Sequence, residues 1–181
     1  MTITDISVDN SVYVRMRLDY QVASVGLRIA LASGRCRKAH RTGCSGTGES
    51  FNGAYNFSQA VLPLMFGSGS DELQYPPTLI FTGATAALKG GNGLGSFAMS
   101  KFAVRAMAQS LAREFGPKGI HVAHAIVDGI IDTEQTKGFH EKMTESKISP
   151  DQIAEAYWYL HTQTKTSFTH ELDLRPYCES W

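Results

Sequence analysis

The chain has 181 residues, of which 43% are hydrophobic and 19% are charged, and its formal net charge at pH 7 is zero. This length suffices for one domain with a hydrophobic core and is short for two. The balanced charge argues against nucleic-acid binding and against attraction to an anionic membrane surface, and no apolar run approaches the roughly 20 residues of a membrane-spanning helix.

The first part of the chain has irregular patterning. Residues 11–20 alternate apolar and polar side chains, which predicts a strand with one buried and one wet side. Residues 21–33 have apolar residues at helical spacing and predict a short helix. Residues 34–50 are interpreted as a loop that contains Thr42-Gly-Cys-Ser-Gly-Thr-Gly48. Such a tract binds a dinucleotide only between a buried strand and a helix, so a flexible loop is the favoured interpretation here.

The pattern becomes regular after residue 52. A helix is predicted at residues 54–65 and a strand at 78–82, followed by a glycine-rich turn. A second amphipathic helix is predicted at 97–115, where Gly116-Pro117 ends it. An apolar run at 120–127 predicts another strand. The order strand, turn, helix, strand is a βαβ unit of a parallel sheet.

The C-terminal part continues the alternation of helix and strand. A polar stretch is followed by Ser149, Pro150 and Gln152, which predict a helix start with a capping box. Residues 168–174 alternate like a strand. His121 and His124 are three apart on a predicted strand and therefore face opposite sides, so no metal site is expected there.

The segment from Thr78 to Thr133 resembles the catalytic half of the short-chain dehydrogenase/reductase family. The family places a Ser after one strand, a Tyr and a Lys one turn apart on the next helix, and a Pro-Gly-x-x-x-Thr loop after the next strand. Lys101 stands at the Lys position, but the Tyr position holds Phe97, and the Ser position holds Ala84 beside Thr85. The chain is similar to an atypical branch that has Phe for Tyr and keeps the Lys.

The resemblance implies a truncated Rossmann-like fold, a doubly wound parallel sheet in a three-layer α/β/α arrangement. Residues 1–50 are expected to be a divergent N-terminal segment of uncertain structure, and residues 51–181 the catalytic-half domain. The loop reads Asp128-Gly-Ile-Ile-Asp-Thr133, with Asp in place of Pro. The resemblance assigns catalytic positions and cofactor contacts to eight residues: catalytic Lys101, Phe97, Ala84 and Thr85, and cofactor-binding Lys101, Asp128, Gly129, Ile130 and Thr133.

The implied activity is NAD- or NADP-dependent oxidation or reduction of small alcohol or carbonyl substrates, in a weakened form. A phenyl ring has no proton to give, and loss of a general acid costs about 10² to 10⁴ in rate. Thr85 is the candidate replacement for the missing Ser hydroxyl. Lys101 either binds ribose hydroxyls, which is favoured, or lies in water with its stem on Phe97. Residues 128–133 either contact the cofactor or form a strand-end turn that starts the next helix.

Dinucleotide binding is expected to be weak, because the sequence has no buried strand leading into a glycine turn ahead of residue 50. Two alternatives stay open: a non-catalytic protein that dimerises through the helices at 54–65 and 97–115, and a mis-spliced or wrongly joined gene product. The three cysteines have no metal-ligand spacing and the N-terminus has no signal-peptide pattern, so the cytoplasm is the expected location. Neither a nucleic acid nor a membrane is an expected partner.

Overall fold

A computed structural model of the chain describes its backbone over six ranges, and the side chains that precede Phe51 lie outside the described part. The ranges are residues 6–9, 11–15, 28–31, 45–67, 74–138 and 145–179.

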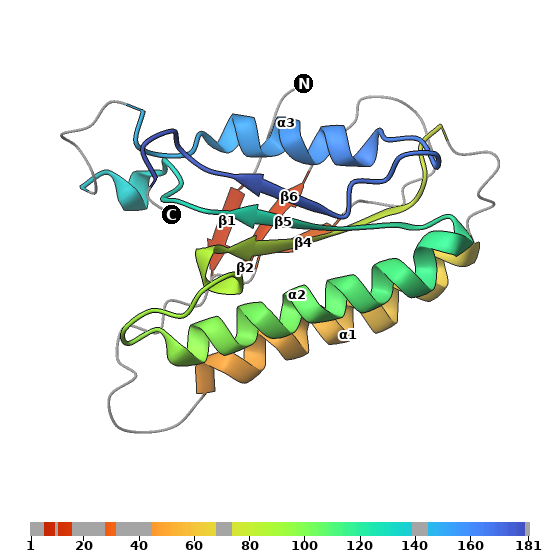
Figure 1. The fold of residues 1–181 in the computed structure, drawn as a ribbon, viewed down its shortest axis with the longest axis horizontal. Helices are drawn as coiled ribbons and strands as arrows, with labels where there is room; N and C mark the ends of the chain where they lie inside the picture. Colours follow the sequence, from red (N-terminus) through yellow and green to blue (C-terminus); the bar gives the residue numbers. More distant parts are fainter. Residues whose placement is uncertain are drawn as a thin grey trace.

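Three parallel strands form the central sheet, in the order β4-β5-β6 (Figure 1). Strand β4 spans Thr78–Ala84, β5 spans His121–Val127 and β6 spans Glu171–Leu174. Every residue of β5 is buried, because this strand lies between the other two and has helices on both faces. The strands predicted at 78–82 and 120–127 are therefore confirmed, whereas β6 begins three residues later than the predicted strand at 168–174.

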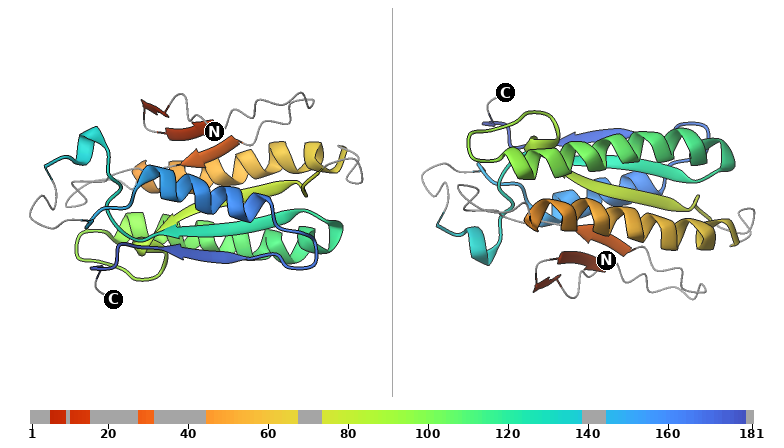
Figure 2. Two further views of the ribbon diagram at one scale, coloured as in Figure 1. Left: turned by 90° about the horizontal axis from the view of Figure 1, so that it is seen from above. Right: turned by 90° about the horizontal axis from the view of Figure 1, so that it is seen from below.

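Helices cover both faces of this sheet. Helices α1 (Ser45–Gly67) and α2 (Gly95–Phe115) lie side by side on one face, and α3 (Pro150–His161) lies on the other (Figures 1 and 2). The described part of the chain also contains three short 3-10 helices, η1 (Thr85–Ala87), η2 (Gly116–Lys118) and η3 (Glu134–Thr136). The arrangement is the predicted three-layer α/β/α, Rossmann-like fold.

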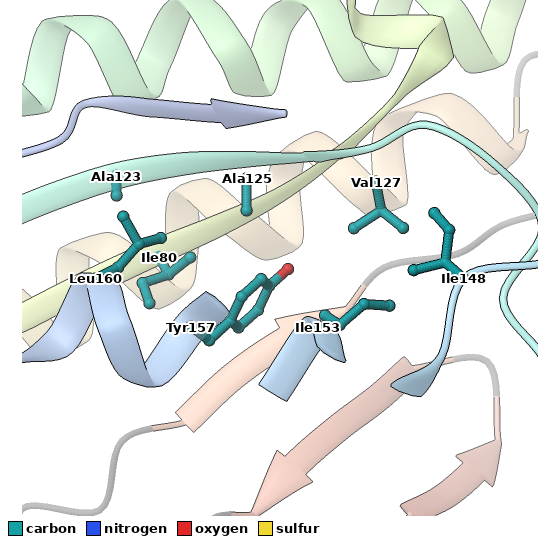
Figure 3. Close-up of a cluster of buried hydrophobic side chains, with 8 residues drawn as sticks. All are labelled: Ile80, Ala123, Ala125, Val127, Ile148, Ile153, Tyr157 and Leu160. Carbon is teal, nitrogen blue, oxygen red and sulfur yellow. The ribbon is translucent and has the colours of Figure 1, made fainter. Parts of the chain in front are cut away.

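Alternate residues of the strands supply two separate cores. The core between the sheet and α3 contains Tyr157 and Leu160 from the helix and one face of β4 and β5 (Figure 3). The opposite face of the strands packs on α1 and α2. Its buried members are Leu62, Met65, Leu79, Phe81, Val104, Ala108, Ile120 and Val122. This period of two along β4 and β5 places successive side chains on opposite faces.

The N-terminal strands form an antiparallel sheet of their own, in the order β1-β2-β3, with bounds Ile6–Asp9, Ser11–Arg15 and Arg28–Leu31. The predicted strand at 11–20 is confirmed over Ser11–Arg15, and its remainder lies outside the described residues. The helix predicted at 21–33 is wrong over β3, since Ile29 and Leu31 pair with Val14 and Val12 of β2. Strand pairing has overridden a weak helical spacing there.

Helix α1 begins earlier than the sequence predicts. The loop predicted at 34–50 is wrong from Ser45 onward, so Gly46 and Gly48 lie in the first turns of a helix. Glycine weakens a helix by roughly 0.5–1 kcal/mol relative to alanine, and packing of the apolar face of α1 against α2 and the sheet offsets that cost. The domain boundary predicted at residue 50 falls inside α1, and the division into two domains stays a prediction.

The predicted capping box of α3 is also wrong. Ser149 is the N-cap residue and Pro150 the first helical residue, but the Ser149 side chain makes no capping hydrogen bond. Gln152 instead donates from Nε2 to Oε2 of Glu155, 3.1 Å away, because its exposed side chain reaches the next turn. A capping box does form at η3, between Thr133 and Thr136.

Candidate functional site

The candidate site lies at the edge of the central sheet where all three strands end. Because the strands are parallel, the residues that follow their last positions lie at the same edge of the sheet. These last positions are Ala84, Val127 and Leu174. In open α/β sheets this carboxyl edge is where ligands bind.

Lys101 projects from α2 into the protein interior, with only 6% of the residue exposed. Its Nζ donates a hydrogen bond to the backbone carbonyl oxygen of Thr82, 3.1 Å away, and lies 5.8 Å from the ring centroid of Phe97. Burial lowers the pKa of the Lys101 ammonium to about 8. The alternative of a solvated surface lysine is therefore excluded, and Lys101 is a buried amine one helical turn from a half-buried phenyl ring.

Thr85 and Asp128 are brought together at the ends of β4 and β5. Ala84 is the last residue of β4, and Thr85 opens η1. The Thr85 hydroxyl donates a hydrogen bond to Oδ1 of Asp128, across 43 residues of sequence. Asp128 is buried, and its backbone N–H donates to the carbonyl of Leu174 at 2.8 Å. The two family hydroxyl positions hold Ala84 and Phe97 and offer no hydroxyl, and that of the neighbouring Thr85 is already hydrogen-bonded to Asp128.

Two charged residues complete this cluster, and sequence reasoning missed both. The guanidinium of Arg175 lies 3.2 Å from Oδ2 of Asp128 and is also paired with the carboxylate of Asp173. Arg175 directly follows β6, so only the parallel pairing of β5 and β6 brings it to Asp128. One feature of the sequence could have indicated them: Asp128 replaces the family Pro, and a buried carboxylate requires a cation or hydrogen-bond donors nearby.

The loop after Asp128 is held by contacts within the chain. A side chain at Gly129 would place its Cβ 2.8 Å from Cδ of Pro176, so only glycine fits this close approach. The backbone of Ile130 and Asp132 pairs with that of Ile148. Thr133 caps η3, which agrees with the alternative of a turn that starts the next helix. The cofactor contacts assigned to Gly129, Ile130 and Thr133 stay predictions.

A second polar cluster links α2 to the sheet. Arg105 forms two hydrogen bonds of 2.7 Å with the carboxylate of Glu171 on β6, and Nδ1 of His124 on β5 lies 3.0 Å from the same carboxylate. Helical spacing alone places Arg105 on the solvent-exposed face of α2, because it gives no information about the end of β6 that lies beside this residue. The structure shows Arg105 half-buried, with 28% of its side chain exposed.

The buried histidines of β5 lie on opposite faces of the sheet. His124 shares a face of the sheet with Glu171 and Arg105, whereas His121 stacks on Phe168 and approaches α3, so the predicted opposite orientation is confirmed. Within the described ranges, no group of three or more His, Cys, Asp and Glu residues is arranged to hold a metal ion. Nor is any helix of those ranges long and apolar enough to cross a membrane.

The histidines make stability depend on pH. Burial lowers the pKa of His121, His124 and His161 below the ordinary value of about 6.5. Below that pH the unfolded chain binds protons that the native state rejects, so acid favours unfolding. We expect the free energy of unfolding, measured by urea denaturation, to fall by about 1 kcal/mol or more between about pH 7.5 and about pH 5.5.

A histidine variant provides the control for this pH dependence. His121→Asn should reduce the difference between the two pH values, because one rejected proton is removed. The hydrogen bond from Arg105 lowers the pKa of Glu171. The contribution of this carboxylate to stability is therefore lost only below the ordinary glutamate pKa of about 4.3, outside the pH range of the experiment. Equal stability at both pH values would contradict the assignment of the buried histidines as neutral.

Comparison with known proteins identifies the family. Residues 7–170 match the family model described as enoyl-(acyl carrier protein) reductase. The chain is 33% identical over 106 residues to L-2,3-butanediol dehydrogenase of Corynebacterium glutamicum, covering 56% of this chain and 40% of that protein. It is 31% identical over 80 residues to 2-dehydro-3-deoxy-D-gluconate 5-dehydrogenase of Pseudoalteromonas atlantica, covering 44% of this chain and 31% of that protein. The chain therefore spans less than half the length of these relatives.

Solved structures support the same assignment. A putative short-chain dehydrogenase/reductase from Burkholderia xenovorans is 28% identical, with a TM-score of 0.55 over 69% of this chain and 50% of that one. A serine dehydrogenase complexed with NADP+ is 19% identical and shows the shared fold, with a TM-score of 0.63 over 79% of this chain and 60% of that one. The match over most of the sequence, together with the parallel sheet and the position of Lys101, places this chain in the short-chain dehydrogenase/reductase family.

Proposed function

We propose that the protein derives from an NAD- or NADP-dependent oxidoreductase of alcohol or carbonyl substrates and has weak catalytic activity or none. The observation that carries this proposal is the pair Lys101 and Phe97 on α2. The amine is buried beside the carboxyl edge of the sheet, but the ring one turn away has no hydroxyl. Lys101, which would lower the pKa of a neighbouring phenol, is present, but Phe97 has no phenol that could donate a proton.

The remaining groups replace the lost chemistry only in part. Ala84 has no donor to polarise a carbonyl, and loss of such a donor typically costs about 10² to 10³ in rate. The Thr85 hydroxyl is directed at Asp128. A buried amine with a pKa of about 8 can move a proton near neutral pH, but the hydrogen-bond partner described for Lys101 is the carbonyl of Thr82. These features support slow turnover at best.

The described residues fit one side of a nicotinamide cofactor. Lys101 and the backbone at Asp128 and Gly129 are the groups that would hold the nicotinamide ribose and its ring, and the cofactor would supply or accept the hydride. The pyrophosphate of a dinucleotide needs a parallel strand leading into a glycine turn and a helix N-terminus. Among the described residues, the strand that precedes α1 is the antiparallel β3. Weak cofactor binding follows from this difference.

Titration calorimetry of the full chain with NADH and NADPH tests the cofactor proposal. We expect a dissociation constant well above the low micromolar range for both, because contacts to the adenosine and pyrophosphate are reduced. A parallel assay of NADPH oxidation with a panel of small ketones and aldehydes should give little or no turnover. Low-micromolar binding would overturn the proposal of a weakened cofactor site, and steady turnover would overturn that of lost acid catalysis.

Phe97→Tyr is the variant that restores the family pair. Its phenol would lie near the buried ammonium of Lys101, which would favour the charged phenolate and lower the phenol pKa. Because residue 97 is half-buried, we expect the fold to tolerate the hydroxyl, at a cost below about 1 kcal/mol in a denaturation experiment. We also expect no measurable turnover, since Ala84 still lacks a donor. Carbonyl reduction by this variant with NADPH would show that the chain binds dinucleotide after all.

A second candidate function is a non-catalytic protein that dimerises through α1 and α2. Tyr55 on α1 and Met99 and Phe102 on α2 are large apolar side chains with 44% or more of each residue exposed. The two helices lie side by side on one outer face of the molecule (Figure 2). Apolar surface of this kind is typical of protein–protein interfaces.

We expect the full chain to form dimers or larger species at micromolar concentration, as measured by analytical ultracentrifugation. Met99→Glu with Phe102→Glu should shift the distribution toward monomer, because charged groups would be buried in the interface. Tyr159→Glu, at an exposed position of α3, is the matched control and should leave it unchanged. A wild-type monomer under these conditions would contradict the dimer proposal. The cytoplasmic location and the wrongly joined gene product stay predictions from sequence alone.

A further inference from the structure

The hydrogen bond between Thr85 and Asp128 has a fixed direction. A guanidinium group has donors and no acceptor, so the Asp128 oxygen that faces Arg175 at 3.2 Å cannot be a donor. Because the carboxylate of Asp128 is ion-paired in this way, it acts as the acceptor, and the hydroxyl of Thr85 must supply the proton between Thr85 and Asp128.

Asp128 is held firmly enough to keep that direction. The residue is buried, and its backbone N–H is bound to the carbonyl of Leu174. Arg175 is itself anchored by Asp173, whose carboxylate receives its Nε at 3.2 Å. The acceptor carboxylate and its counter-ion thus follow directly on the ends of β5 and β6.

The consequence concerns what Thr85 can offer to a ligand. A hydroxyl has one donor and two acceptor lone pairs. The single donor of Thr85 is used by Asp128, so its oxygen presents acceptor capacity alone. Thr85 is half-buried, so this residue at the carboxyl edge of the sheet is partly open to solvent.

We propose that Thr85 binds the hydroxyl group of an alcohol in preference to the carbonyl group of the matching ketone or aldehyde. An alcohol can donate to the Thr85 oxygen, whereas a carbonyl oxygen would meet an acceptor and leave both groups unsatisfied. The proposal rests on the proposed function for its substrate class and adds the oxidation state that the site prefers. Asp128 is a positioning residue in this arrangement, because it acts on the ligand only through Thr85.

The test uses the full chain with cyclohexanol and cyclohexanone, a matched pair, in ligand-observed saturation-transfer titrations without nicotinamide. We expect cyclohexanol to bind about tenfold more tightly than cyclohexanone, which corresponds to about 1.4 kcal/mol. Thr85→Ser keeps the hydroxyl and should keep the preference. Thr85→Val keeps the shape without the hydroxyl and should bring the two affinities to within about twofold of each other.

Asp128→Asn gives the sharper outcome. Its amide oxygen would face the Arg175 donors, which leaves the amide NH₂ directed at Thr85. The Thr85 oxygen would then accept and its proton would turn to the ligand, so the preference should reverse in favour of cyclohexanone. Circular dichroism checks that this variant is folded, and the Thr85 pair decides the question if it is not.

Three results would overturn the proposal: equal or ketone-favouring binding by the wild type, no binding of either probe, or an alcohol preference that survives in Thr85→Val. Since no dinucleotide is present, these results are independent of the titrations with NADH and NADPH. An absent alcohol preference would refute the proposal for Thr85 whatever the cofactor titrations show. An alcohol preference without cofactor binding would support both the proposal for Thr85 and that of a weakened cofactor site.

Discussion

Gly83→Ala should lower the free energy of unfolding by about 2 to 3 kcal/mol, within the usual range for overpacking a core. A Cβ at this position of β4 would lie 2.4 Å from Nε2 and 2.7 Å from Cε1 of His124 on the neighbouring strand. Real Cβ atoms do not approach other heavy atoms so closely, so either the imidazole or the strand must shift.

The imidazole of His124 is poorly able to shift. The side chain is fully buried, and its Nδ1 is bound to Glu171, which is in turn held by two hydrogen bonds from Arg105. Rotation of the ring would break this linked set, and displacement of β4 would disturb its parallel pairing with β5. The cost therefore cannot be relieved by a small local movement.

Urea denaturation monitored by tryptophan fluorescence measures this effect. Gly53→Ala is the matched control, because a Cβ there has no atom within 4 Å and alanine favours the helix. That control should be neutral or stabilising. In the background of His124→Ala, the penalty of Gly83→Ala should fall by more than half, since the colliding ring is gone. An equal penalty in both backgrounds would contradict the role given to His124.

Arg105→Met should destabilise the protein by about 2 kcal/mol. Arg105 and Glu171 are 28% and 27% exposed, so their two hydrogen bonds are more protected than those of a surface pair, which is worth about 0–1 kcal/mol. The loss is smaller than the roughly 3–5 kcal/mol of a fully buried pair, because water still reaches the carboxylate. Arg105→Lys should be intermediate, since an ammonium cannot form the bidentate contact.

A double-mutant cycle of Arg105→Met with Glu171→Gln isolates the pairwise contribution. We expect a coupling free energy of about 1 kcal/mol or more, because the two residues join α2 to β6 across 66 residues of sequence. Arg113→Met is the control: Arg113 lies on the exposed face of the same helix and bonds only to a carbonyl of its own helix among the described contacts. A loss for Arg105→Met no larger than for Arg113→Met would contradict this account.

Local patterns in the sequence determined the central elements. The apolar run that became β5 is buried on both faces, and this is why it reads as continuous. Pro117 marks the end of α2 because proline cannot continue the helix, and Gly119, with a φ of 86°, ends the short 3-10 turn that follows. The order of these elements, with Lys101 one turn after Phe97, was enough to predict the parallel sheet and the family.

Only the tertiary structure decided which polar groups meet. Thr85, Asp128 and Arg175 come from the ends of three strands, and Arg105 and Glu171 from a helix and a strand far apart in sequence. No local spacing encodes these pairs, because they depend on strand register and on which helix face the sheet covers. The burial of Lys101 has the same cause. The helical periodicity of α2 does not show whether this side chain is buried, because its hydrogen-bond partner is the carbonyl of Thr82 on the separate strand β4.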